Sequence, residues 1–323
     1  MGRYVVRRLL WAVVLFVAVT MITYVIFFVI PADPAVLAAG RSARPADVAR
    51  VRHYLGLDHS VPYQYGLFLK RLIVDQSLGR SFVNRRAVNS MVGQAAPVTA
   101  SLVFGGAILW MLLAIPIGVL SALRPRSLLD RAAMVFVLIG ISMPVVVIGL
   151  ILQYVFGFKW NVLPNAGYCD VINPPLGATC GGPAEWFTHM ILPWVTFAIL
   201  FTAIYVRMIR SNVMDTLGED YVRTAWAKGA PGARVMTRHV LRNALLPVVT
   251  MLGMDIAIAL GGAIFTEYIF GLPGLGRLAV QSLMSFDLPT IEGVVVFATL
   301  CIIILNLVVD VLYAFIDPRI RLE

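Results

Sequence analysis

Long apolar runs dominate the chain. Six of them come close to the ~20 residues that an α-helix needs to cross the hydrocarbon core of a bilayer. They cover residues 9–30, 99–122, 132–157, 188–209, 244–265 and 289–316. Thr, Pro and Gly interrupt the fourth and fifth runs, so the ends of these two are the least sharply defined. The pattern predicts an all-α, polytopic membrane protein with about six transmembrane helices.

The first run is open to two interpretations, a transmembrane helix or a cleavable signal peptide. Its basic start, with Arg3, Arg7 and Arg8, is typical of both. Its apolar part, about 22 residues long, exceeds the usual signal-peptide core, and no small-x-small cleavage site follows it. We therefore expect a retained helix, with residues 1–30 forming the N-terminal segment and first span.

The segment 31–98 is too long to be a simple loop. From Pro45, apolar residues recur at helical spacing as far as Leu55, and Gly56 predicts the end of that helix. A second amphipathic stretch covers residues 62–75. We expect a small helical insertion over 31–98, followed by a membrane core over 99–323. The basic residues of the insertion form either a solvated face or a docking surface for another protein.

The segment 207–243 is too polar to span a membrane, yet its apolar residues recur near helical spacing. The stretch 229–232 (GAPG) must break a helix. The pattern predicts two short helices joined at a bend. Such helices can lie on lipid, pack on the protein itself or enter the groove of a partner, and periodicity alone leaves all three open.

A glycine-rich turn, 270–276 (FGLPGLG), follows the fifth run and precedes a short, partly apolar helix. Glycine-rich loops can cradle phosphate, but this one lacks the flanking strand of a nucleotide site. We favour a half-inserted lid, with Phe270, Pro273 and Gly274 as gate candidates. Ionisable residues at membrane depth are rare and suggestive, which makes Asp255 a candidate for lining a pathway. We expect Glu292 near the outer end of the sixth span, where its charge costs little.

Composition agrees with a membrane protein. Hydrophobic residues make up 60% of the 323 residues and charged residues only 13%, whereas a soluble domain carries roughly 25% charged residues. The surplus apolar surface must therefore face lipid.

Lys and Arg are unevenly distributed between the two sides that the runs define. With the N-terminus inside, the two short outer loops hold only Lys159 and Arg277. The inner segments hold 15 of the 26 basic residues, namely Arg3, Arg7, Arg8, Arg124, Arg126, Arg131, Arg207, Arg210, Arg223, Lys228, Arg234, Arg238, Arg242, Arg319 and Arg321. Cytoplasmic loops carry such an excess, so we expect both termini to be cytoplasmic. The net charge of +9 suits an anionic inner leaflet and requires no nucleic-acid partner.

Two cysteines, Cys169 and Cys180, lie in the loop 158–187, which the charge distribution puts outside. That compartment permits disulfides, and a bond between them would stabilise the loop by roughly 3 kcal/mol. Two free thiols are the alternative. We expect no metal site, because the other candidate ligands, Asp170, Glu185 and His189, show no motif spacing.

The chain carries no recognisable catalytic motif. None of its three lysines completes a P-loop, the four histidines do not form a HExxH site, and there is no GxSxG sequence. We therefore expect no catalytic residue and no enzyme activity in this chain. A chain with spans and an organised inner loop but no energy source is either one part of a larger machine or a secondary transporter. A secondary transporter predicts inverted repeats or broken helices with ion ligands, and no clear repeat is present.

Short tags occur along the whole chain, namely 8–10 (RLL), 30–35 (IPADPA), 55–58 (LGLD), 77–82 (SLGRSF), 142–144 (SMP), 163–168 (LPNAGY), 270–276 (FGLPGLG), 306–310 (NLVVD) and 317–321 (DPRIR). Taken in order, this set is highly specific, and through it the chain resembles the B-type permeases of bacterial dipeptide and oligopeptide ABC importers from end to end. A departure is Ala32, where family members often have Gly.

The inner loop is similar to the EAA motif of such permeases, which has the form EAA, three residues, Gly, nine residues and I-x-L-P. Here 223–225 (RTA) stands for EAA, Gly229 keeps the spacing and 239–242 (HVLR) stands for I-x-L-P. The resemblance assigns contact with an ATPase to the loop 211–243, with its first helix at about 217–228. The residues concerned are Asp220, Arg223, Thr224, Ala225, Lys228, Gly229, His239 and Leu241.

The resemblance also implies a type I importer permease fold and a set of partners in a bacterial inner membrane. This chain would pair with a homologous C-type permease and form half of the translocation pathway. Two cytoplasmic ATPase subunits would bind ATP and Mg²⁺, with no cofactor in this chain, and an extracytoplasmic solute-binding protein would deliver the peptide.

Overall fold

The computed structural model describes residues 2–29, 34–39, 44–55, 57–171 and 180–316, and the regular structure of these residues is helical. The predicted all-α class is therefore confirmed. The elements, with η marking π-helices, are α1 (Gly2–Tyr24), η1 (Val25–Val29), α2 (Pro34–Ala39), α3 (Pro45–Leu55), α4 (Val61–Ile73), α5 (Val88–Leu123), α6 (Leu128–Ser142), α7 (Val145–Leu152), η2 (Gln153–Lys159), α8 (Pro183–Leu217), α9 (Asp220–Ala227), α10 (Gly232–Arg234), η3 (Val235–Leu241), α11 (Arg242–Ala244), α12 (Leu246–Leu260), α13 (Ile264–Ile269), α14 (Leu275–Met284) and α15 (Leu288–Ile316).

Four stretches of the described helices are long and apolar enough to cross a membrane: Val6–Phe27, Val88–Leu123, Pro183–Leu217 and Leu288–Val308. Two bent pairs, α6 with α7–η2 and α10–α11 with α12, raise the number to six if each pair is one span. The six predicted runs fall on these stretches. The second span differs most, because α5 begins at Val88 rather than near residue 99.

The third run is not one straight helix. α6 ends at Ser142, α7 begins at Val145, and the two parts meet at 105°. Proline lacks a backbone N–H and its ring excludes the α conformation from the residue before it. Met143 accordingly adopts φ −91° and ψ 127°, an extended conformation. Pro144 therefore divides a stretch that hydropathy alone presents as continuous.

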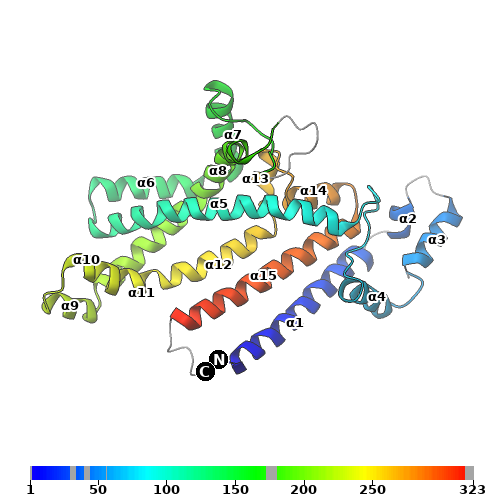
Figure 1. The fold of residues 1–323 in the computed structure, drawn as a ribbon, viewed down its shortest axis with the longest axis horizontal. Helices are drawn as coiled ribbons and strands as arrows, with labels where there is room; N and C mark the ends of the chain where they lie inside the picture. Colours follow the sequence, from blue (N-terminus) through cyan, green and yellow to red (C-terminus); the bar gives the residue numbers. More distant parts are fainter. Residues whose placement is uncertain (1, 30–33, 40–43, 56, 172–179, 317–323) are drawn as a thin grey trace. The chain divides into compact units, whose positions relative to one another are not determined.

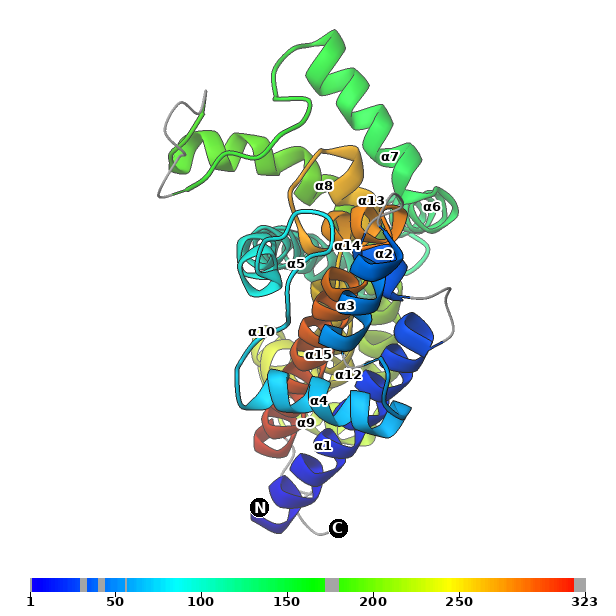
Figure 2. The same ribbon diagram turned by 90° about the vertical axis from the view of Figure 1, so that its right-hand side faces the viewer.

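The helices form two compact units. The first comprises Met1–Ala100, Ala257–Glu267 and Pro273–Glu323, and the second Ser101–Ile256 and Tyr268–Leu272. In the first, α1 runs alongside α15 (Figure 1), and α4 lies across α1 (Figure 2). The contact is polar at Thr20, whose hydroxyl is 2.8 Å from that of Tyr65, and aromatic where Tyr24 meets Tyr65 and Phe68. The predicted helices at Pro45 and at 62–75 correspond to α3 and α4, while Gly56 and residue 30 lie outside the described residues.

A buried carboxylate joins the segment before α5 to the start of α15. Asp287 is 2% exposed and accepts hydrogen bonds from Ser81 Oγ at 2.5 Å, Phe82 N at 2.8 Å and Thr290 Oγ1 at 2.7 Å. A buried carboxylate needs several hydrogen bonds to offset the cost of removing its charge from water. Asp287 therefore anchors the insertion to the last long helix.

Glu292, one turn further along α15, corrects an expectation. Its side chain is 5% exposed, and Oε1 has no hydrogen-bond partner. α1 and α4 cover this end of α15 through the cluster of Tyr24, Phe68 and Val296. Glu292 therefore lies in a buried environment, where a charged side chain is costly.

In the second unit, α6 lies beside α8, and glycines let the helices approach closely. A Cβ at Gly140 would lie 2.9 Å from Ala203 Cβ, and one at Gly118 would lie 2.9 Å from Ile209 Cβ. The buried Trp110 ring stacks on Phe201 with centroids 4.5 Å apart. Close helix packing of this kind replaces the hydrophobic driving force that lipid removes.

We predict that Asp287→Ala lowers the free energy of unfolding by about 3 kcal/mol, because the buried Ser81 and Thr290 and the partly buried Phe82 N–H lose their acceptor. Denaturant unfolding of the purified chain in detergent measures the change. The matched control is Asp75→Ala, since Asp75 is exposed; a loss of equal size in both variants would contradict the anchoring role.

Candidate functional site

The inner loop is a compact helix–turn–helix that follows α8 (Figure 1). Val222 of α9 and Val235 and Val240 of η3 are at most 1% exposed and hold its two arms together. Two amides add polar contacts: Asn243 Nδ2 donates to Tyr221 Oη at 2.8 Å, and Asn212 Nδ2 donates to the carbonyl of Ala244 at 3.2 Å. The two predicted short helices and the bend between them are present, and the loop is fixed to α8.

The turn at Gly229 closes α9 with a Schellman motif. Gly229 N donates to the carbonyl of Trp226 at 2.9 Å, and Ala230 N donates to the carbonyl of Ala225 at 3.2 Å. The motif needs a left-handed residue after the helix cap, and Gly229 supplies φ +74°. The left-handed backbone conformation of this turn therefore explains why glycine occupies position 229.

The predicted coupling residues share this loop but differ in exposure. Five of the eight are exposed, namely Asp220, Arg223, Thr224, Lys228 and Gly229. Ala225, His239 and Leu241 are partly buried. The Asp220–Arg223 ion pair spans 3.6 Å between side chains that are 97% and 72% exposed, so it contributes little to stability.

α9 also exposes large aromatic side chains. Trp226 is 52% exposed and Tyr221 41% exposed. The Trp226 ring reaches within 3.2 Å of where a Cβ at Gly232 would stand. Part-exposed aromatic side chains flanked by charges are typical of a binding face.

The pathway and gate candidates divide between the two units: Asp255 and Phe270 belong to the second, and Pro273 and Gly274 to the first. In the second unit, Asp255 accepts a hydrogen bond from Tyr205 Oη at 2.7 Å, and the carbonyl of the buried Phe270 accepts one from Gly167 N at 2.8 Å. In the first unit, Pro273 precedes Gly274, and a Cβ at Gly274 would collide with the carboxyl group of Glu267. Gly274 is therefore required by the close approach of Glu267.

Glu267 is the residue that sequence reasoning missed. It is fully buried; Oε1 accepts from Thr99 Oγ1 at 2.7 Å and Oε2 accepts from Arg277 N at 2.8 Å. Thr99 Oγ1 in turn accepts from Leu275 N at 2.8 Å. The two side chains thus cap the N-terminus of α14, where a carboxylate also meets the positive end of the helix dipole. The only sign of this role in the sequence was the position of an acidic residue shortly before the glycine-rich turn. Burial raises the pKa of Glu267, and these hydrogen bonds oppose the rise.

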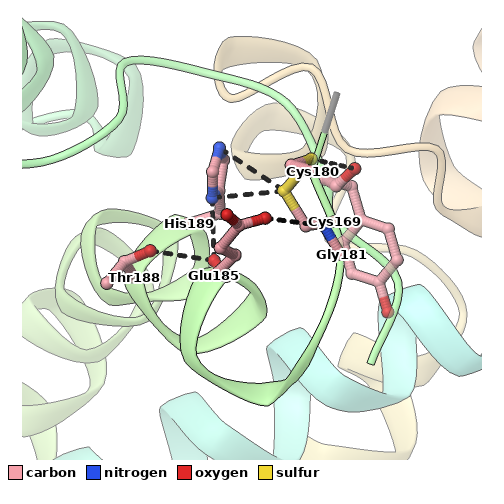
Figure 3. Close-up of a disulfide and its surroundings, with 7 residues drawn as sticks. Cys169, Cys180, Gly181, Glu185, Thr188 and His189 are labelled. Carbon is pink, nitrogen blue, oxygen red and sulfur yellow. Dashed lines mark hydrogen bonds between the residues drawn. A yellow bond between two sulfur atoms is a disulfide. The ribbon is translucent and has the colours of Figure 1, made fainter. Parts of the chain in front are cut away.

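The outer loop contains the Cys169–Cys180 disulfide, with Cα atoms 5.5 Å apart; residues 172–179 of its ring lie outside the described residues. Figure 3 shows His189 lying against it, with Nδ1 3.4 Å from Cys169 Sγ. Gly181 N donates to Glu185 Oε2 at 2.6 Å, which ties the loop to the first turn of α8. The two sulfurs and a His189 nitrogen lie within 4.8 Å of one another, but the disulfide occupies both thiols that a metal ion would need.

Comparison with known proteins identifies relatives along the whole chain. Residues 114–322 match the family described as "Binding-protein-dependent transport system inner membrane component", and residues 1–103 match its N-terminal counterpart. The "Probable peptide ABC transporter permease protein y4tP" of Sinorhizobium fredii is 36% identical over 99% of this chain and 100% of its own length. The dipeptide transport system permease protein DppB of Escherichia coli K12 is 36% identical over 99% of each chain.

A solved structure shares the fold. The inward-facing MetNI methionine ABC transporter superposes with a TM-score of 0.53 over 70% of this chain and 96% of its own, at 14% identity. At that identity the likeness concerns the fold alone.

We predict that Glu267→Ala costs about 3 kcal/mol of unfolding free energy, because Thr99 and the start of α14 lose a buried acceptor. Glu219→Ala is the control, since Glu219 is exposed and makes no capping hydrogen bond with its side chain. Thermal unfolding in detergent compares the two, and equal melting temperatures would rule out the capping role.

Proposed function

The chain belongs to the family of binding-protein-dependent transport system inner membrane components, and from this premise we propose that it is the B-type permease of an ATP-driven importer for dipeptides or oligopeptides. The observation that carries the proposal is end-to-end similarity to relatives named for peptide and dipeptide transport. Members of this family are non-catalytic, multi-pass proteins of the inner membrane. The substrate class and the partners named below are our proposal.

The inner loop is the proposed contact with a cytoplasmic ATPase. α9 is exposed over most of its surface, carries Trp226 and Tyr221, and stands on a buried valine core. A rigid amphipathic helix of this kind suits a groove on a partner. In this assignment, two ATPase subunits bind ATP and Mg²⁺, and no cofactor binds to this chain.

The remaining partners follow from the same assignment. A homologous C-type permease would cover part of the exposed apolar helix surface and complete the pathway, and lipid would cover the rest. A solute-binding protein would deliver peptide on the extracytoplasmic side. Cytoplasmic termini agree with the distribution of Lys and Arg, and the disulfide loop then lies in a compartment that permits oxidation.

Reconstituted vesicles test the function directly. We expect vesicles containing the full transporter and its binding protein to accumulate radiolabelled dialanine or trialanine when ATP is supplied on the ATPase side. Uptake driven by a proton or sodium gradient without the ATPase subunits would instead identify a secondary transporter.

The coupling loop gives a residue-level prediction. Ala225→Glu puts a charge on a partly buried position of α9, and Gly229→Pro removes the N–H of the Schellman turn and cannot adopt φ +74°. We expect both variants to insert in the membrane but to lose at least tenfold in peptide uptake. Ala233→Glu, a new charge at an exposed position of the same loop, serves as the control. Normal uptake by Ala225→Glu and Gly229→Pro would refute the assignment of α9.

A further inference from the structure

A bidentate ion pair links α6 to α8 within the second unit. Arg210 Nε donates to Asp130 Oδ1 at 2.7 Å, and the second nitrogen of the guanidinium fork donates to Oδ2 at 3.1 Å. The side chain of Asp130 is 6% exposed and that of Arg210 is 25% exposed. Two parallel hydrogen bonds fix orientation as well as distance, so this contact sets the register between the two helices.

The same carboxylate also holds the turn between α5 and α6. Arg126 N donates to Oδ2 at 2.8 Å, and the hydroxyl of the buried Ser121 donates to Oδ1. Asp130 thus accepts hydrogen bonds from the end of α5, from the turn and from α8. We name Asp130, Arg210 and Ser121 the carboxylate clamp.

Apolar packing surrounds the clamp but does not replace it. Gly118 allows α5 to approach Ile209 of α8, and Gly140 allows α6 to approach Ala203. The hydrophobic contribution of such contacts is non-directional. The ion pair is directional, and its two partners must separate before α8 shifts along α6.

α8 leads directly into the coupling loop. It ends at Leu217, and α9 begins at Asp220 after a two-residue turn, in which Gly218 N and Glu219 N bond to the carbonyls of Asp215 and Thr216. Val213 of α8 and Val222 of α9 are both fully buried. A displacement of α9 is therefore imposed on the end of α8 that carries Arg210.

We propose that Asp130 and Arg210 are positioning residues that pass movement of the coupling helix α9 from α8 to the α5–α6 hairpin. This inference rests on the proposed function, in which an ATPase moves α9. Without the clamp, α8 would follow the ATPase while α5 and α6 lag behind, so hydrolysis would continue without transport.

The first test measures the ratio of peptide taken up to ATP hydrolysed, in vesicles containing the complete transporter. This ratio does not depend on how much protein folds, so a purely structural role leaves it unchanged. We expect Asp130→Asn and Arg210→Gln each to lower it at least tenfold while hydrolysis stays within about twofold of wild type. Arg210→Lys keeps the charge but loses the fork, and we expect an intermediate ratio.

Matched controls remove equal charge nearby. Arg207→Gln acts on α8 and Arg131→Gln on α6, and both residues are exposed. We expect each control to keep the wild-type ratio. A wild-type ratio in Asp130→Asn and Arg210→Gln would overturn the proposal, as would an equal fall in the controls.

A second test needs no peptide. Arg124→Cys, in a Cys301→Ser background, places a thiol at an exposed position in the α5–α6 turn. We expect ATP with vanadate to change its labelling rate by a thiol reagent when the clamp is intact, and not when Asp130→Asn is added. A nucleotide response that survives Asp130→Asn would overturn the proposal. Absence of peptide uptake by the wild type would count against the proposed substrate class alone, because this labelling readout does not depend on it.

Discussion

A backbone amide in hydrocarbon has no water to bond, so a break between apolar helices must be satisfied by the protein itself. At Pro144 the ring removes one donor, and Met143 N bonds to the carbonyl of Ile139 at 3.0 Å. Between α12 and α13, Gly261 N and Gly262 N bond to carbonyls at the end of α12. At the start of α14 side chains take over, because Glu267 and Thr99 accept from the first amides.

Hydrophobic pattern predicted the long helices because lipid-facing surface leaves a direct trace in sequence. Turn chemistry likewise predicted the bend at Gly229, since a left-handed cap needs glycine. The pattern was less informative where burial is by protein instead of lipid. The first turns of α5 pack Val88 and Val92 against other buried side chains, but they also contain the exposed Asn89, Ser90 and Gln94. Hydropathy therefore placed the start of that helix eleven residues too late. The 105° bend at Pro144 was also hidden, because both arms are apolar.

The buried carboxylates were harder to predict, for a different reason. Asp130, Glu267 and Asp287 are visible as acids in or beside apolar sequence, but their partners are remote. Arg210 is 80 residues from Asp130, Thr99 is 168 from Glu267 and Ser81 is 206 from Asp287. A single sequence carries no signal for such pairs, so an acid that caps a helix cannot be told from one that lines a pathway. Asp255 is an example. Its position in an apolar run suggested a pathway residue, whereas its hydrogen bond with Tyr205 is visible only in the structure.

The three carboxylates stand at junctions where the chain changes direction, and this position has a physical basis. Small residues such as Gly and Ala let helices approach closely, but the apolar contacts that result are non-directional. A carboxylate with several fixed donors resists sliding, and its cost of burial is offset only in one register. If an ATPase moves the inner loop, as proposed, such junctions would let the helices that they join move together.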